Sequence, residues 1–148
     1  MSLFNRTSPN RQQNQSALSP AEAFTAITLI AIAIDGYAAD AEIGAINAAL
    51  SRMQLFRSYP NDVMRKMIDR LLNLLQRQGA DMLLNAAVTT LPHDLQETAF
   101  AMAADIVLAD GDVTEEEEAL LNKLYRNLGI SEENALKIID VMIIKNRG

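Results

Sequence analysis

The chain has 148 residues, of which 49% are apolar and 5% aromatic, enough apolar material to bury the core of one ordinary domain. It has no cysteine and one histidine, which excludes disulfides, iron–sulfur clusters, thiolate zinc sites and any metal site built from several histidines. The formal net charge of −6 argues against a broad nucleic-acid-binding face. The longest apolar run, Ala26 to Ile34, is far shorter than the roughly 20 residues of a membrane-spanning helix. We expect neither a membrane span nor a secretion signal.

The first 18 residues are rich in Asn, Gln and Ser and have no apolar period. They carry Arg6 and Arg11 and no acid. This composition predicts a flexible tail, residues 1–18, before one helical domain at 19–148.

Ser19 and Pro20 begin the first predicted helix as its N-cap and first helical residue, and Glu22 completes a capping box. The helix is expected to continue to about Ile34 and to be buried, because it is apolar nearly all round. The pair Asp35-Gly36 ends it.

Three more helices are expected before Pro92, and each has its own apolar positions. The second starts near Ala39 or Asp40, with a buried face at Ile43, Ile46, Leu50 and Met53. The third follows Pro60, with an apolar stripe at Val63, Met67, Leu71, Leu74 and Leu75. The fourth spans about 80–90, after Gly79, with core residues Met82, Leu83, Ala86, Ala87 and Leu91.

Three further helices complete the predicted fold. The fifth runs from Pro92 to about Ala109, with core residues Leu95, Ala99, Met102, Ile106 and Val107. Asp110-Gly111 ends it, and Thr114 with Glu117 forms the capping box of the sixth, whose core face is Leu120, Leu121, Leu124 and Leu128. Ser131 caps the seventh, where the apolar residues are Leu136, Ile139, Val141, Met142 and Ile143.

The chain also contains an internal duplication. A shift of 75 residues places Asp35 on Asp110, Gly36 on Gly111 and Glu42 on Glu117. The predicted fold is therefore all-α: about seven helices in two pseudo-symmetric three-helix repeats plus one extra helix. The repeated parts are residues 19–54 and 92–129.

Two interpretations of the Asp-Gly segments stay open. In the first they are purely structural, because glycine ends a helix at low cost and acids in a first turn suit the helix dipole. In the second they form a divalent cation site, since each Glu stands six residues after its Gly, as in the second half of a calcium-binding EF-hand loop. The first half of that loop is missing, because Ile106 and Leu108 stand where acids would be needed.

The second segment is the more acidic. Residues 105–118 carry seven acids and no base: Asp105, Asp110, Asp112 and Glu115 to Glu118. Such a run attracts cations or basic partners, although a solvated acidic face is the ordinary alternative. The sequence has no nucleophile elbow, phosphate-binding glycine loop or zinc-protease motif, and we expect His93 to be an exposed surface residue. The prediction is a protein that is not an enzyme.

The segment Ala-Asp-Gly-Asp-Val-Thr-Glu-Glu-Glu-Glu at 109–118 resembles the signature of the TerB-like tellurite-resistance family. The segment at 34–43 is similar to its first copy, and the resemblance covers roughly residues 19–146. It implies a cytoplasmic, non-enzymatic binding or scaffold protein of the tellurite or metal-stress response, with seven helices in two related halves.

The resemblance also implies a site and a partner. The family's acidic positions fall here on six residues, which would bind Ca²⁺, Mg²⁺ or Mn²⁺ weakly: Asp35, Asp40, Glu42, Asp110, Asp112 and Glu117. The first copy departs from the pattern, because Ala39 stands where Thr114 caps and Tyr37 where Asp112 lies. The implied partner is a protein such as a TerC-like membrane protein. The alternative is a protein-interaction module without metal, which docks a membrane or stress-complex partner.

Overall fold

A computed structural model describes residues 18–34, 39–109 and 111–147. Within these ranges the chain forms seven α-helices, two short 3-10 turns and no strand. The helices are α2 (Pro20–Ala33), α3 (Asp40–Ser51), α4 (Asn61–Gln78), α5 (Ala80–Thr90), α6 (Gln96–Leu108), α7 (Glu115–Asn127) and α8 (Glu132–Lys145). The 3-10 turns are Gln54–Phe56 and His93–Leu95. The all-α fold predicted from the sequence is confirmed.

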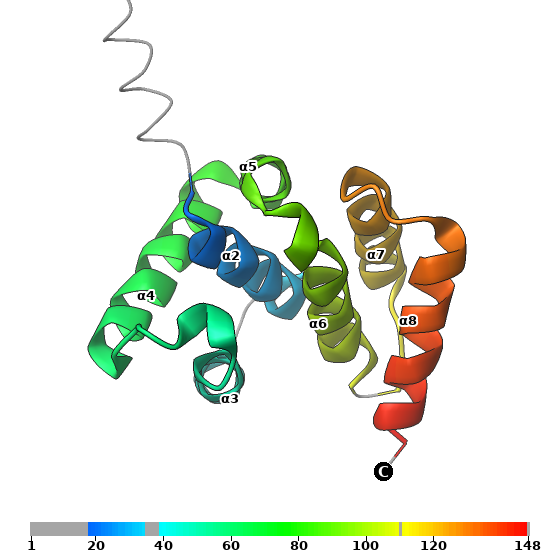
Figure 1. The fold of residues 1–148 in the computed structure, drawn as a ribbon, viewed down its shortest axis with the longest axis horizontal. Coiled ribbons are helices and arrows are strands. Elements are labelled where there is room, and N and C mark those ends of the chain that lie inside the picture. The colour runs from blue at the N-terminus through cyan, green and yellow to red at the C-terminus, as the bar shows by residue number, and fades with distance from the viewer. Residues whose placement is uncertain (1–17, 35–38, 110, 148) are drawn as a thin grey trace, which may run out of the picture.

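Helix α2 lies at the centre of the molecule (Figure 1). It contacts α3, α4, α5 and α6, and eleven of its fourteen residues are buried. Even its two buried threonines are satisfied locally, because the Thr25 and Thr28 hydroxyls donate to the carbonyls of Ala21 and Phe24, each at 2.8 Å. A helix that is apolar all round is therefore used as a core element, as the sequence predicts.

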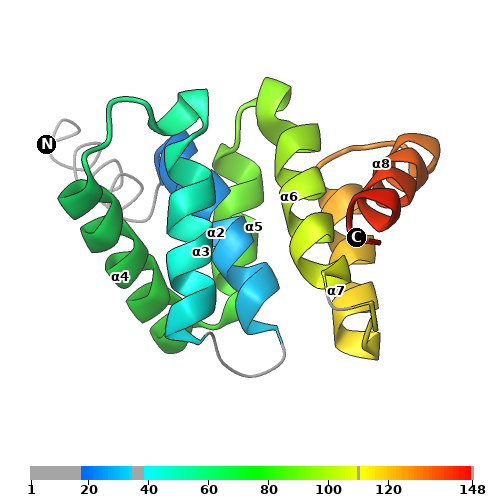
Figure 2. The same ribbon diagram turned by 90° about the horizontal axis from the view of Figure 1, so that it is seen from below.

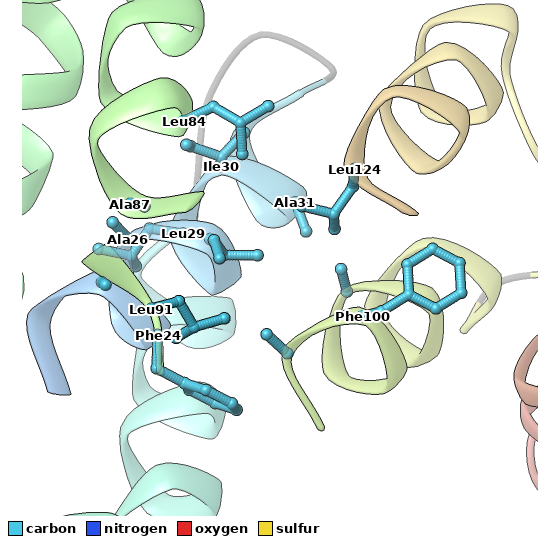
Figure 3. Packing of buried hydrophobic residues seen from close by; sticks show 14 of the residues in the cluster. Phe24, Ala26, Leu29, Ile30, Ala31, Leu84, Ala87, Leu91, Phe100 and Leu124 are labelled. Atoms are coloured by element: carbon cyan, nitrogen blue, oxygen red, sulfur yellow. The ribbon is translucent and has the colours of Figure 1, made fainter. Parts of the chain in front are cut away.

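The remaining helices form two groups around α2. Helices α3, α4 and α5 pack on one side of it, and α6 connects it to α7 and α8 on the other (Figures 1 and 2). One apolar core joins the two groups, with side chains of α2, α5, α6 and α7 converging in Figure 3. Aromatic rings pack edge-on within each group: Phe24 lies 6.3 Å from Phe56, and Phe100 lies 6.2 Å from Tyr125.

Capping residues fix where several helices begin. Ser19 and Glu22 make the predicted reciprocal pair, in which Glu22 N–H donates to Ser19 Oγ at 3.1 Å and Ser19 N–H donates to Glu22 Oε1 at 2.8 Å. Ser131 Oγ accepts from Asn134 N–H at 3.1 Å at the start of α8. These bonds satisfy amide groups that a helix leaves without partners in its first turn.

Two core predictions were wrong. Val63 of α4 is 41% exposed and Met82 of α5 is 62% exposed. The buried side of α4 is formed by Met64, Met67, Ile68 and Leu71, so its centre is rotated by about one residue from the predicted stripe. Both errors arise because an apolar residue at the edge of a helical stripe fits the period equally well whether or not a neighbouring helix covers it.

Two further expectations concern the tail at the start of the chain and the internal repeat. Residues 1–17 lie outside the described part of the chain, while Leu18 packs against the core. The chain order of α2 and α3 matches that of α6 and α7. The pseudo-symmetry of two three-helix repeats stays a prediction.

Within the described ranges, no helix combines the length and apolarity that a bilayer crossing requires.

Candidate functional site

The segment between α6 and α7 begins with a glycine-dependent turn. Gly111 has φ of 87°, a left-handed conformation that side-chain-bearing residues rarely adopt. Its N–H donates to the carbonyl of Leu108 at 3.2 Å, which satisfies one of the last carbonyls of α6. The prediction that Gly111 ends this helix is confirmed, whereas Asp110 lies outside the described residues.

Thr114 and Glu117 then fix the start of α7. Glu117 N–H donates to Thr114 Oγ1 at 3.1 Å, and Thr114 N–H donates to Glu117 Oε1 at 2.9 Å. The side chain of Glu117 is buried, and the residue is only 6% exposed. A predicted metal ligand therefore already has one oxygen committed to the protein backbone.

The corresponding start of α3 has half of this arrangement. Ala39 N–H donates to Glu42 Oε1 at 3.3 Å, but the Ala39 side chain has no oxygen to return a bond. Glu42 and Asp40 are both exposed. The equivalent acids of the two segments, Glu42 and Glu117, thus have different surroundings.

The six predicted ligands are placed unevenly. Asp40 and Glu42 lie in the first turn of α3, and Asp112 and Glu117 lie on either side of the Thr114 cap. Asp35 and Asp110 fall outside the described residues. Among residues 18–34, 39–109 and 111–147, no three acids or histidines are grouped closely enough to hold a metal ion. A site completed by Asp35 or Asp110 stays a prediction.

An exposed carboxylate surface surrounds the N-terminus of α7, formed by Asp112, Glu115, Glu116 and Glu118. None of the ion pairs among the described residues involves these four acids. Lys123, the first base of α7, donates to Asp81 of α5 at 2.8 Å. The backbone amides at the N-terminus of α7 partly offset the four charges.

Asp105 belongs to the acidic run in sequence but not to this surface. Its Oδ1 accepts from Lys145 Nζ at 3.1 Å and from Asn146 Nδ2 at 2.8 Å, so it ties the end of α8 to α6. Sequence reasoning missed this role. The signal was an acid between Ala104 and Ile106, inside the apolar part of the helix at 99–108. Such an acid needs a polar partner when a neighbouring helix covers it.

Two acids that the 75-residue shift relates, Glu22 and Glu97, occupy comparable places near the starts of α2 and α6. Glu22 Oε2 forms an ion pair with Arg70 of α4, and Glu97 Oε2 accepts from Asn134 of α8 at 3.4 Å. Each acid contacts the helix that comes two helices later in the chain. This correspondence favours the predicted repeat.

A comparison of the sequence with models of protein families identifies the family of this chain. A family model described as Tellurite resistance protein TerB matches residues 21–139, which is most of the chain. The chain belongs to the TerB family. No curated protein and no solved structure matched it.

TerB membership makes this chain a domain related to tellurite resistance, and the family is in general non-enzymatic. Two surface hollows of this TerB chain lie away from the acidic surface. One, of about 430 Å³, lies between α6 and α8 and is lined by Thr98, Ala101 and Ile138 among others. The other, of about 380 Å³, lies between the start of α2 and α4 and includes Tyr59 and Met67. His93 is exposed, as expected.

Proposed function

We propose that this TerB-family chain is a binding or scaffold protein of the tellurite or metal-stress response, and that its acidic Asp-Gly segments bind a divalent cation weakly. The observation that supports this most is the exposed carboxylate surface at the start of α7. Asp112, Glu115, Glu116 and Glu118 are exposed and outside every ion pair of the described residues. Carboxylate oxygens are the ligands that Ca²⁺, Mg²⁺ and Mn²⁺ prefer.

Weak binding follows from the geometry of the segment. Glu117 Oε1 accepts a hydrogen bond from Thr114 N–H, so this side chain has less freedom to turn toward an ion. The remaining acids lie on solvent and would leave most of the coordination shell to water. Each segment therefore suits a partly hydrated ion at millimolar concentration, or a basic protein surface that uses the same charges.

A second function is favoured by the hollow between α6 and α8. Ala101 and Ile138 give it apolar surface, while Glu97 and Lys137 supply charge at its edge. Such a hollow suits a protein segment with no metal. In this alternative the chain is an interaction module that docks a membrane or stress-complex partner, for example a TerC-like membrane protein. For either function we propose a protein of the cytoplasm that reaches the membrane through its partner.

Calorimetric titration with Ca²⁺, Mg²⁺ and Mn²⁺ separates the two functions. At ten times the dissociation constant, an ion should stabilise the fold by about 1.4 kcal/mol, which raises the melting temperature by a few degrees. The variants Asp112→Asn and Glu117→Gln should weaken binding, and Gln at 117 can still accept the Thr114 amide. Asp69→Asn, an exposed acid of α4, is the matched control.

The cation proposal fails if wild type shows neither heat nor a thermal shift up to about 10 mM cation. It also fails if Asp69→Asn weakens binding as much as Asp112→Asn, because the effect is then only net charge. Binding of a lysine-rich peptide without cation binding would show that the carboxylate surface serves a basic protein partner instead of an ion.

A further inference from the structure

Helix α8 exposes an unusual amount of apolar side chain. Leu136, Val141, Ile143 and Ile144 are 53%, 56%, 39% and 63% exposed. By helical spacing, Leu136, Ile143 and Ile144 share one side of the helix, which we call the outer face of α8, whereas Val141 lies on another side because it is two residues from Ile143. Ala135 is the one buried residue of this helix. By contrast, no residue of α3 or α7 is among the exposed large hydrophobic residues.

The outer face is left uncovered because α8 lies at the edge of the molecule. It packs on α6 and α7 through its opposite side, where Ile138, Ile139 and Met142 are partly buried (Figure 1). Single exposed apolar residues are ordinary, but a group on one helix commonly marks a contact surface. Sequence reasoning noted Leu136 and Ile143 as apolar without predicting on which side they lie, and it did not single out Ile144.

The charges along α8 indicate what covers this face. Its first turn is acidic, with Glu132 and Glu133, and the exposed Arg147 follows its end. Lys145 is held by Asp105 of α6, and Glu133 has only an exposed ion pair with Lys137, at 3.4 Å. A two-fold symmetric contact must be self-complementary, with the same patch on both copies. An antiparallel pair of α8 helices meets that condition, because the acidic start of each helix then faces Arg147 of the other.

The spacing of residues along α8 determines which side chains would meet in such a pair. If the two-fold axis passes near Asp140, Leu136 lies opposite the partner's Ile144, and Glu133 lies opposite the partner's Arg147. Both pairs occur twice by symmetry. The macrodipoles of the two helices are also opposed, which is the favourable orientation.

We infer that the outer face of α8 is a self-association surface, on which a second copy of this chain packs its own α8 antiparallel about a two-fold axis near Asp140. This surface is separate from the exposed carboxylate surface and does not depend on the proposed function. Because three apolar side chains on one helix make a small interface, the dimer is weak, with a dissociation constant of the order of 10–100 µM.

Sedimentation of the full chain from about 5 µM to about 1 mM tests this surface. Wild type should change from monomer to dimer, and Ile144→Glu should remain a monomer throughout. Met82→Glu is the matched control, because Met82 is 62% exposed on α5, outside this face. It should dimerise like wild type. Both variants should melt close to wild type at low concentration, since neither residue is buried.

Charge variants test the antiparallel arrangement. Glu133→Lys should weaken the dimer about fivefold, and Glu133→Lys combined with Arg147→Glu should restore it, because each pair is then reversed. Asp140→Asn should strengthen the dimer severalfold, because two like charges meet near the axis.

A wild type that stays monomeric at every concentration overturns the proposal. So does a dimer that Ile144→Glu leaves intact, since another surface must then hold it. A dimer that Glu133→Lys weakens and the double exchange fails to restore overturns the antiparallel arrangement.

Discussion

The starts of α3 and α7 are related in sequence but are stabilised differently. At α7 the Thr114 side chain and the Glu117 carboxylate each accept a backbone N–H, and Glu117 is buried. At α3 Ala39 offers no side-chain acceptor, and Glu42 is exposed. The hydrogen bond from Ala39 N–H to Glu42 Oε1, at 3.3 Å, is longer than its counterpart at α7, at 2.9 Å. The second segment thus has a helix start with two side-chain hydrogen bonds and several further acids. The first has one such bond, and Asp40 is the only other acid of its first turn.

This difference shows how an Asp-Gly segment can use different acids for helix capping and for binding a partner. Capping requires one hydroxyl and one carboxylate in fixed places, and α7 assigns Thr114 and Glu117 to that task. The other acids of its first turn, Glu115, Glu116 and Glu118, are then available for a partner. At α3 the acid of the third helical position, Glu42, is also a candidate ligand, and Asp40 is the only other acid of the first turn.

The largest expected effect comes from removing the two equivalent glutamates. Glu117→Ala should lower the free energy of unfolding by about 2 kcal/mol and the melting temperature by about 6 °C, because the Thr114 amide loses its acceptor in a partly buried place. Glu42→Ala should cost less than about 0.5 kcal/mol, because its bond lies in solvent. Thermal and urea unfolding of both variants measure the difference. Equal losses would contradict the contrast between the two starts.

A smaller effect is expected from exchanging the caps themselves. Thr114→Ala should lower the free energy of unfolding by about 1 kcal/mol, the usual loss for an N-cap hydroxyl. Ala39→Thr should gain about 0.5–1 kcal/mol. The backbone at Ala39, with φ −72° and ψ 149°, is already close to that of Thr114, at −76° and 166°.

Urea unfolding of the two cap variants, with Ala41→Thr inside α3 as the control, measures both changes. A stability unchanged by Ala39→Thr would show that α3 begins elsewhere or frays in solution.

The smallest effect concerns the two acids that reach across to α4 and α8. Arg70→Ala should lower the free energy of unfolding by less than about 1 kcal/mol, because the Glu22–Arg70 ion pair is partly exposed. This loss should be smaller in high salt, which screens the pair. Asn134→Ala should cost still less and show no salt dependence, because its long bond to Glu97 is between a neutral and a charged group. Unfolding at about 0.05 M and about 1 M NaCl separates the two cases. A salt-independent loss for Arg70→Ala would mean that packing, rather than charge, carries that contact.

Much of the fold could be predicted from the sequence because its helix boundaries have local causes. Ser19, Thr114 and Ser131 cap helices through neighbours three residues away, and Gly111 takes a conformation that favours glycine. Exposure of Val63 and Met82 could not be predicted in the same way, because it depends on where another helix lies.

The candidate site was less predictable for a related reason. A cation site requires several oxygens to meet in space, and the sequence supplies acids without their mutual placement. Asp105 shows the difficulty: it counts toward the acidic run in sequence, yet Lys145 and Asn146 hold it on the side facing α8. The burial of Glu117 was likewise not readable from its place in a run of four glutamates.

The position of α2 has a consequence for synthesis. This helix is the first of the described helices to be made, and its apolar surface is complete at Ala33. One of its main covers, α6, is complete only at Leu108, 75 residues later. At about 5–20 residues per second, the ribosome needs roughly 4–15 s to supply that cover. During this interval α4 and α5 arrive first and can shield one side of α2, while the side destined for α6 is exposed to chaperones and to other nascent chains.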